Sequence, residues 1–344
     1  MVKRFSGSLW VSFFGFGIAF WIGYREGGVS AAFSTLFLTI VLAVLEVSLS
    51  FDNAVVNASV LGRMTELWRR RFLTWGILVA VFGMRLVLPL AIVAIMAQVS
   101  PLSALLMAIE DPKGYAAMML SIHETVAAFG GTFLFMVGLE YFLDHEKDEH
   151  WLHWIEAPLV RLGRVKSAEV ILALTVVLSM TFFVEERIRL SFLIAAVCGI
   201  ITFLIVDGLG ALLGGENEDV NKATVRDAHR LSLGLFLYLE VLDASFSFDG
   251  VVGAFALTQS LFLIAIGLGI GAMFVRSITI VLVEQGTLQQ FRYLEHGAFW
   301  AILSLAVLMY AGIFAHIPEF ITGLCGALFI GSAVMSSRRA EPSA

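Results

Sequence analysis

The feature that most limits what this chain can fold into is a succession of long apolar segments. Ten such segments are centred in 8–24, 31–61, 72–98, 124–143, 168–184, 190–214, 231–258, 260–283, 298–315 and 319–336. A helix of about 20 apolar residues crosses the hydrocarbon core of a bilayer. Only 15% of the 344 residues are charged, against about a quarter in soluble chains, so most of the surface is expected to meet lipid. We predict an all-α polytopic membrane protein with about ten transmembrane helices.

Composition excludes several classes of function. The two cysteines, Cys198 and Cys325, lie in apolar segments and predict neither a disulfide framework nor a thiolate metal site. The net charge is −6, and the sequence gives no basic patch of the kind that binds nucleic acid. Positions 8–24 lack a small-residue cleavage site and are interpreted as a first transmembrane helix rather than a signal peptide. The segment 99–123, broken around Pro112, is either re-entrant or interfacial.

Basic residues gather in alternate loops, which indicates the orientation of the chain. They are Lys3, Arg4, Arg63, Arg69, Arg70, Arg71, Arg161, Arg164, Lys166, Lys222, Arg226, Arg230, Arg338 and Arg339. All of these clusters face the cytoplasm if both termini do, whereas the opposite loops carry few basic residues. We therefore predict a multi-pass protein of the bacterial inner (plasma) membrane with both termini in the cytoplasm.

An internal duplication relates two of the apolar segments. EVSLSFDNAVVNA (46–58) aligns with DASFSFDGVVGAFA (243–256), which pairs Glu46 with Asp243, Ser50 with Ser247 and Asp52 with Asp249. On the predicted topology the two helices run in opposite directions, which is the inverted repeat of many secondary transporters. The chain then divides into an N-terminal helix (1–30), repeat A (31–143), a cytoplasmic linker with two connecting helices (144–230), repeat B (231–336) and a cytoplasmic tail (337–344).

The duplicated segments carry the candidate functional residues. An ionisable side chain inside a spanning helix costs several kcal/mol unless it is paired, hydrated or coordinated. At about 100° per residue, Glu46, Ser50 and Asn53 share one stripe, while Asp52 points roughly 120° away from Glu46. A helix break near the Ser-Phe-Asp motif of each repeat would let the acids converge. We predict a cation site formed by Asp52, Asp249, Glu46, Asp243, Asn53, Ser50 and Ser247.

The oxygen-rich ligand set favours hard divalent cations such as Mn²⁺, Mg²⁺ and Ca²⁺. Arg85 and Arg276, with Glu240 on the second helix, are the supporting counter-charges. One alternative is that these arginines pair with the acids in a purely structural polar core. Another is that they hold the empty carboxylates until metal or protons replace them.

The chain resembles a known family at these motifs. ExxLSxDN at 46–53 and DxxFSxD at 243–249 are similar to the two signature motifs of the TerC/Alx integral membrane proteins, within the wider LysE-like transporters. The resemblance covers roughly 31–143 and 231–336. It implies inverted three-helix units, manganese efflux and an association with tellurite-resistance operons, and it implicates Asp52, Asp249 and their neighbours. Gly250 departs from the serine that usually follows the second aspartate, so metal preference is expected to differ.

The expected function is export of a divalent metal cation, most readily manganese, with protons as counter-ions. Expected partners are the metal substrate and the lipid bilayer, with a homo-oligomer left open; we expect no resident cofactor and no enzymatic activity. Alternatives are export of calcium or another cationic solute, and a non-transporting stress-response scaffold. An intramembrane aspartyl protease is disfavoured because YD and GxGD motifs are absent. The segment 144–156, rich in histidine, is interpreted as an interfacial helix rather than a metal sensor.

Overall fold

The computed structural model describes residues 2–76, 78–96, 98–145, 147, 149–214, 225–315 and 317–340. All regular elements in these ranges are helical, as predicted. In chain order they are α1 (Val2–Leu49), α2 (Phe51–Gly62), α3 (Glu66–Arg71), η1 (Phe72–Gly76), η2 (Val79–Val87), α4 (Leu88–Met96), α5 (Pro101–Glu110), α6 (Pro112–Ser121), α7 (His123–Leu143), α8 (His153–Leu162), α9 (Ala168–Thr181), α10 (Glu186–Gly214), α11 (Val225–Leu257), α12 (Leu261–Glu284), α13 (Thr287–Gln290), α14 (Leu294–Gly312) and α15 (Glu319–Ala340).

Seven described helices, namely α1, α7, α10, α11, α12, α14 and α15, are long and apolar enough to cross a membrane. The paired segments Glu66–Gly76 and Val81–Ile95 pass the same test as one span that is bent by 41°. Large apolar side chains of the outer helices remain exposed, such as Phe13 on α1 and Phe182 beside α9. Lipid covers such side chains at low cost, whereas water does not. The described chain is therefore an all-helical bundle with several helices that are long and apolar enough to cross a bilayer.

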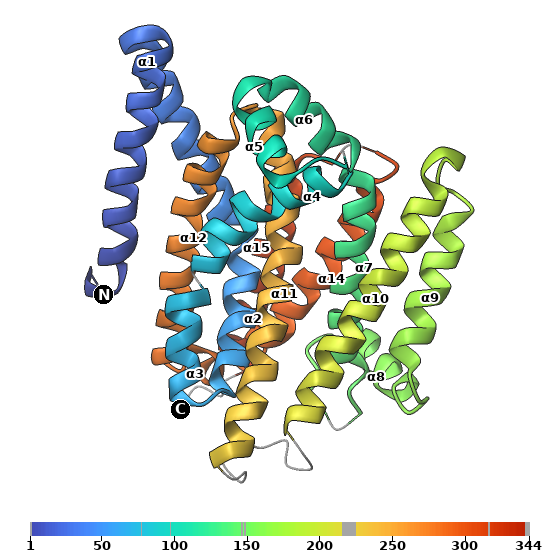
Figure 1. The fold of residues 1–344 in the computed structure, drawn as a ribbon. Helices are drawn as coiled ribbons and strands as arrows, with labels where there is room; N and C mark the ends of the chain where they lie inside the picture. The colour runs from blue at the N-terminus through green and yellow to red at the C-terminus, as the bar shows by residue number, and fades with distance from the viewer. Residues whose placement is uncertain are drawn as a thin grey trace.

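The first helix is folded back on itself. Gly27 and Gly28 have non-helical backbone angles, and the φ of +72° at Gly28 is one that glycine adopts without steric cost. The two halves pack closely at Gly23, where any side chain would collide with Thr35 of the other half. Figure 1 shows the N-terminal half (dark blue) running beside the rest of α1. The predicted segment 8–24 thus forms one arm, and the predicted segment 31–61 forms the other arm and continues into α2.

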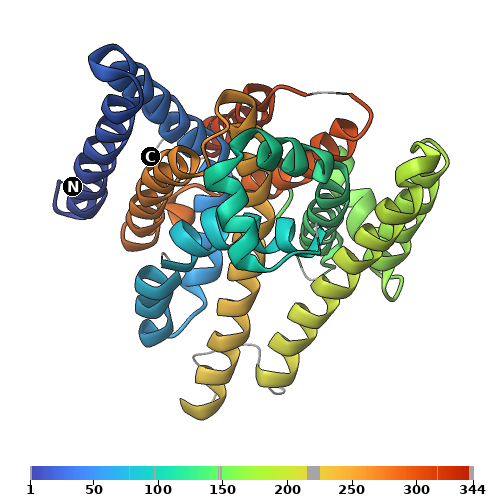
Figure 2. The ribbon, with the colours of Figure 1, turned by 45° about the horizontal axis from the view of Figure 1, so that its top comes forward.

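The central helices bury the main core. In Figures 1 and 2, α1 and α12 form one edge of the bundle, and α9 with α10 forms the opposite edge. Between them, α2, α7, α11 and α14 enclose a cluster that includes Val55, Phe133, Leu239 and Ile302. Each of these side chains is almost fully buried. This core holds α2 and α11, which carry the duplicated motifs, in fixed relative positions.

Both termini lie at one end of the bundle. Arg4 forms an ion pair of 2.5 Å with Glu284 at the end of α12. The backbone N–H of Tyr293, just before α14, donates to Ser337 Oγ near the end of α15 over 2.9 Å. The opposite end is covered by α5 and α6, which form from the segment 99–123 (Figure 1).

The two motif-bearing helices differ in continuity. The chain is interrupted at Ser50 (φ −104°, ψ 15°), between α1 and α2, as the sequence predicts. The prediction of a matching break near Gly250 is wrong, because α11 is continuous from Val225 to Leu257. A Cβ placed on Gly250 would lie 3.5 Å from Glu46 Oε2, which is an ordinary van der Waals distance. The Glu46 side chain therefore lies against α11 at Gly250.

Candidate functional site

A cavity with a volume of about 50 Å³ is lined by residues of both duplicated motifs. Water needs roughly 10–15 Å³ of such space, so the cavity has room for an ion with a small number of waters. It lies among α1, α2, η1, η2, α11 and α12. Its polar lining consists of Glu46, Ser50, Asn53, Asn57, Arg85, Asp243, Ser247, Arg276 and Thr279.

Helical spacing brings one polar stripe to this cavity. Glu46, Ser50, Asn53 and Asn57 recur at intervals of three or four residues, which places them on one face. All four are less than a tenth exposed and all line the cavity, as the stripe predicts. The interruption at Ser50 does not disturb the stripe, because the backbone bonds from Ser50 N to Glu46 O (2.9 Å) and from Ala54 N to Ser50 O (3.1 Å) persist.

The same continuity explains where Asp52 lies. Its side chain is 5% exposed, but it faces α15, where a Cβ on Gly326 would lie 3.6 Å from Asp52 Oδ2. Asp52 is not among the described residues that line the cavity. The expectation that a break brings Asp52 and Glu46 together is therefore wrong: the helical phase is kept, and so is the angle of roughly 120° between them. Asp249 lies on α11, and its side chain is outside the described residues.

Glu46 is neutralised by a buried cation. Arg85, only 4% exposed, donates from Nη2 to Glu46 Oε1. The Ser50 hydroxyl donates to the same oxygen over 2.9 Å. Arg85 comes from η2, a π-helical segment that forms one wall of the cavity. This ion pair joins two elements whose residues lie 39 positions apart.

Asp243 is stabilised by amides instead. Asn53 Nδ2 donates to Asp243 Oδ1 over 2.6 Å, and Asn57 Nδ2 donates to the same oxygen over 3.1 Å. The carbonyl oxygens of both asparagines are buried and have no hydrogen-bond partner in the described structure. Asp243 also lies within electrostatic reach of Arg85 and Glu46. The cavity thus combines carboxylate, amide and hydroxyl oxygens from α1, α2, α11 and α12.

The contacts show that α2 and α11 run antiparallel. Glu46, before α2, lies against Gly250, while Asn53 bonds Asp243. Further along, the backbone N–H of Thr65 donates to Ser232 Oγ over 3.0 Å. Residue numbers rise on one side as they fall on the other. The two motif helices therefore meet in opposite directions around the cavity.

The other two counter-charges do not form the expected pairs. Arg276 lines the cavity but donates to the backbone carbonyl of Leu73. Glu240 lies beside Gly76, outside the cavity lining, and its carboxylate oxygens have no hydrogen-bond partner in the described residues. Arg276 follows Asp243 by 33 positions while Arg85 follows Glu46 by 39, so the two arginines are not equivalent. Among the described side chains, no group of three or more His, Cys, Asp or Glu has metal-binding geometry.

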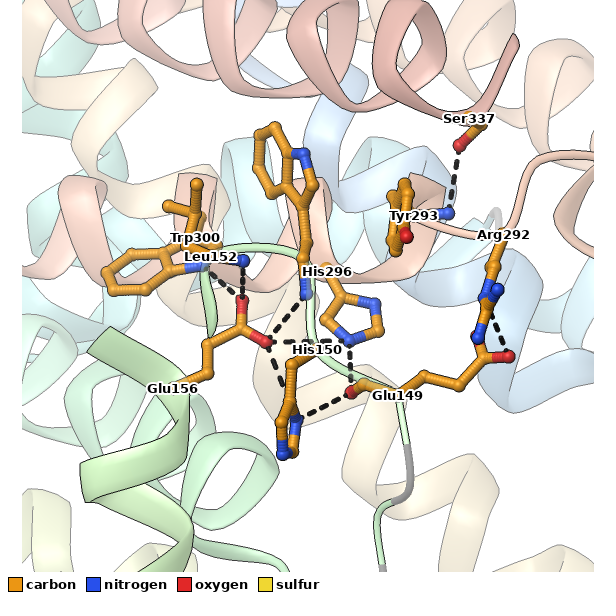
Figure 3. Close-up of polar contacts among 10 residues, drawn as sticks. Glu149, His150, Leu152, Glu156, Arg292, Tyr293, His296, Trp300 and Ser337 are labelled. Atoms are coloured by element: carbon orange, nitrogen blue, oxygen red, sulfur yellow. Dashed lines mark hydrogen bonds and ion pairs between the residues drawn. The ribbon is translucent and has the colours of Figure 1, made fainter. Parts of the chain in front are cut away.

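A second buried polar cluster, which sequence reasoning missed, centres on Glu156 of α8. Glu156 is 1% exposed, and its carboxylate accepts three N–H bonds. The donors are the backbone of Trp151 (3.0 Å), the backbone of Leu152 (3.2 Å) and the indole of Trp300 (3.0 Å). Figure 3 shows Leu152 and Trp300 beside the Glu156 carboxylate. The cluster ties the connection between α7 and α8 to α14.

Three further contacts hold this connection. His296 Nε2 lies 2.9 Å from the backbone oxygen of Glu149, and the Glu149 carboxylate pairs with Arg292 at 2.8 Å (Figure 3). Lys147 packs over the ring of Tyr141, with 3.3 Å between Nζ and the ring centroid. The segment 144–156 is thus only partly the expected interfacial helix, because α8 begins at His153. No local sequence pattern predicts this cluster, because the partners of Glu149 and Glu156 on α14 are 144 or more positions further along the chain.

The fold and the cavity together define a class: an all-helical bundle with several candidate membrane-spanning helices and a buried charged cavity between two antiparallel helices. Residues 51–342 match the model of a family described as Protein of unknown function (DUF475), and the chain belongs to this family. The match includes every cavity-lining residue named above except Glu46 and Ser50. No curated protein and no solved structure matches the chain.

Proposed function

We propose that this protein is a secondary transporter that exports a divalent metal cation, most readily Mn²⁺, in exchange for protons. The observation that carries the proposal is that Glu46 and Asp243, from antiparallel helices, share one buried cavity. Keeping two acids inside a membrane is costly, and such residues usually mark an ion pathway. A purely structural polar core needs no space, whereas this one contains a cavity.

The donor set supports a hard cation. Carboxylate, amide carbonyl and hydroxyl oxygens are the ligands that Mn²⁺, Mg²⁺ and Ca²⁺ prefer. Asn53 and Asn57 each leave a buried carbonyl oxygen without a partner in the described structure, and a cargo ion would satisfy both. The same oxygens are poor ligands for Cu⁺, and neither free cysteine lines the cavity.

An inverted repeat of about ten spans is part of the proposal. The seven candidate helices count α1 once, although it folds back at Gly27 and Gly28. With both arms of α1, the bent pair and the 14-residue α9, the chain makes ten passes. The repeat alignment pairs Glu46 with Asp243 and Asn53 with Gly250. The contact between Asn53 and Asp243 is then the counterpart of the one between Gly250 and Glu46, as a twofold axis requires.

The proposal also covers the orientation of the chain in the membrane and its relation to a known family. The end that holds both termini also holds most of the basic loop residues, including Arg63 and Arg338. The bias of positive charge toward the cytoplasm then places this end inside a bacterial inner membrane. We also propose kinship with the TerC/Alx proteins, on the basis of the duplicated acidic motifs.

The test is metal flux into proteoliposomes that contain the purified full-length protein, with Mn²⁺, Ca²⁺, Mg²⁺ and Zn²⁺ compared. Glu46→Gln and Asp243→Asn are expected to lower the initial Mn²⁺ rate at least about tenfold, which is about 1.4 kcal/mol. Asp52→Asn and Asp249→Asn test the remaining acids of the motifs. Glu66→Gln is the control, because Glu66 forms only an exposed pair with Arg70.

The outcomes separate the candidate functions. Normal flux in all four cavity and motif variants would show that the cation pathway lies elsewhere. Absence of flux for every metal in the wild type would favour a scaffold. A proton gradient that drives Mn²⁺ movement, measured with a pH-sensitive dye, would support exchange.

A further inference from the structure

We infer that Arg85 is a tethered counter-ion that occupies the cation site at rest, and that the cargo must displace it from Glu46. This inference rests on the proposed function and deepens it, because it names the group that competes with the cargo. It also separates the two arginines that the sequence presents as a pair.

Arg85 bonds one acid of the cavity and lies near the other. Its guanidinium donates to Glu46 Oε1 and lies within electrostatic reach of Asp243. At 4% exposure, a charged guanidinium is held in a membrane interior only by such partners. One side chain thus supplies positive charge to carboxylates from two opposed helices, which is the place a bound cation would take.

The charges of the cavity explain why displacement is needed. Among its described lining residues, Glu46 and Asp243 are balanced by Arg85 and Arg276. A divalent cation that enters a balanced, poorly solvated cavity has no net charge to attract it. If Arg85 leaves while Arg276 remains, the charged lining residues carry a net charge of −1, which attracts the cation. Arg276 stays in place, because it is bonded to the backbone carbonyl of Leu73.

The local backbone offers a way to withdraw Arg85. It belongs to η2, nine residues of π-helix, which follows the π-helical η1. Such segments are rare and frequently occur at functional sites. A shift of one residue in helical register turns a side chain by about 100° around the helix axis. A change from π-helix to α-helix in η2 would therefore carry Arg85 away from Glu46 without unfolding the span.

The experiment measures Mn²⁺ binding to the purified full-length protein by titration calorimetry. Arg85→Gln removes the competing charge and is expected to lower the Kd for Mn²⁺ at least about tenfold. Arg276→Gln is the comparison: it removes a charge from the same cavity but not from Glu46, and is expected to lower the Kd by less than about threefold. Arg70→Gln, at an exposed ion pair, is expected to leave the Kd unchanged.

Each result decides between the proposals. If the wild type transports Mn²⁺ but Arg85→Gln binds it no more tightly, the inference fails and the transporter stands. Equal gains in Arg85→Gln and Arg276→Gln would show general electrostatics and would also overturn it. If neither the wild type nor any variant binds or moves a cation, both proposals fail.

A second variant covers the case in which Arg85→Gln does not give a monodisperse protein. Arg85→Lys keeps the charge but replaces the planar guanidinium with a compact ammonium, which cannot reproduce its hydrogen-bond geometry. We expect a Kd for Mn²⁺ about threefold lower than in the wild type. A Kd equal to or above the wild-type value would overturn the inference.

Discussion

At the scale of single residues, the two acids of the cavity are stabilised in different ways. Glu46 is neutralised by a guanidinium, whereas Asp243 accepts two amide hydrogen bonds. The acids occupy equivalent positions in the duplicated sequence, but Asn53 of one repeat corresponds to Gly250 of the other. In the proposed transport, the two halves of the site would therefore not bind an ion identically. A cargo ion would meet one charge-paired carboxylate and one amide-bonded carboxylate.

The amide bonds to Asp243 can be tested through stability. Asn53→Ala removes the donor at 2.6 Å. A hydrogen bond to a charged group contributes about 1.5–3 kcal/mol, so we expect a loss of about 2 kcal/mol in the free energy of unfolding. Chemical unfolding in detergent measures the change. Ser48→Ala is the control, because Ser48 is exposed and bonds only within its own helix; equal losses in both variants would contradict the role of Asn53.

Glu156 is expected to hold the segment 144–152 against α14; we call this segment with Glu156 the latch. Glu156→Ala leaves the N–H groups of Trp151, Leu152 and Trp300 without their acceptor. Buried donors without partners cost about 1–3 kcal/mol each, so the segment 144–152 should open and become sensitive to protease. Mass spectrometry of the fragments locates the cleavage. Cleavage no faster than in the exposed control Glu110→Ala would show that other contacts hold the segment.

Lys147 gives the latch a dependence on pH. Burial lowers the pKa of Lys147 from 10.5 to about 8, while nearby carboxylates such as Glu156 oppose the shift. Between these two pH values the unfolded chain binds more protons than the folded one, so stability rises with pH. Below about pH 8 both states are protonated and the cost of burying the charge is constant.

The variant Lys147→Met isolates this effect. It should remove the part of the rise in latch stability between pH 8 and 10.5 that Lys147 contributes. Proteolysis of the segment 144–152 at both ends of this range gives the comparison. Lys166→Met, at an exposed position, should keep the wild-type dependence. An unchanged dependence in Lys147→Met would exclude Lys147 as its source.

At the scale of elements, the cavity depends on close packing between α1 and α12. A Cβ on Gly271 would lie 2.5 Å from Glu46 Cβ, and a Cβ on Gly267 would lie 2.5 Å from Leu42 Cβ. Two glycines one helical turn apart thus let α1 bring Glu46 to the cavity. A larger side chain at either position must push the helices apart.

Gly271→Ala is therefore expected to destabilise the protein by about 1–3 kcal/mol, the usual cost of overpacking, and to reduce Mn²⁺ binding by displacing Glu46. Thermal unfolding and titration calorimetry measure the two effects. Gly331→Ala on α15 is the matched control, because nothing lies within 4 Å of its Cβ position. That change is expected to be neutral or slightly stabilising, since alanine favours helix. Equal behaviour of the two variants would contradict the packing argument.

At the scale of the whole molecule, the bundle has two chemically different ends. One end holds both termini and the latch. The other end holds the point where α1 folds back on itself, the helices α5 and α6, and the turn before α12. In a background without Cys198 and Cys325, an impermeant thiol reagent added outside intact cells should label Ser260→Cys but not Ser167→Cys. The reverse pattern would invert the proposed orientation, and labelling of both would contradict the bundle as a set of spans.

Local patterns predicted much of this molecule. The helical class, the polar stripe of Glu46, Ser50 and Asn53, and the interruption at Ser50 all depend on residues within a few turns of one another. Hydrophobic periodicity and helical phase act over that range. They also predicted that Asp52 points away from Glu46 on a helix that keeps its phase; the added expectation of convergence failed because the backbone bonds across Ser50 persist.

Residue patterns along the chain suffice to predict a helical bundle suited to a membrane, with buried acids in two duplicated segments. Three contacts become visible only when the helices are packed together: Glu46 pairs with Arg85, Asn53 bonds Asp243 across 190 positions, and Trp300 donates to Glu156. The difference lies in how far along the chain each interaction reaches. Helix formation depends on near neighbours, whereas the partner of a buried charge is set by how separate helices pack, because any uncompensated charge there would cost too much to keep.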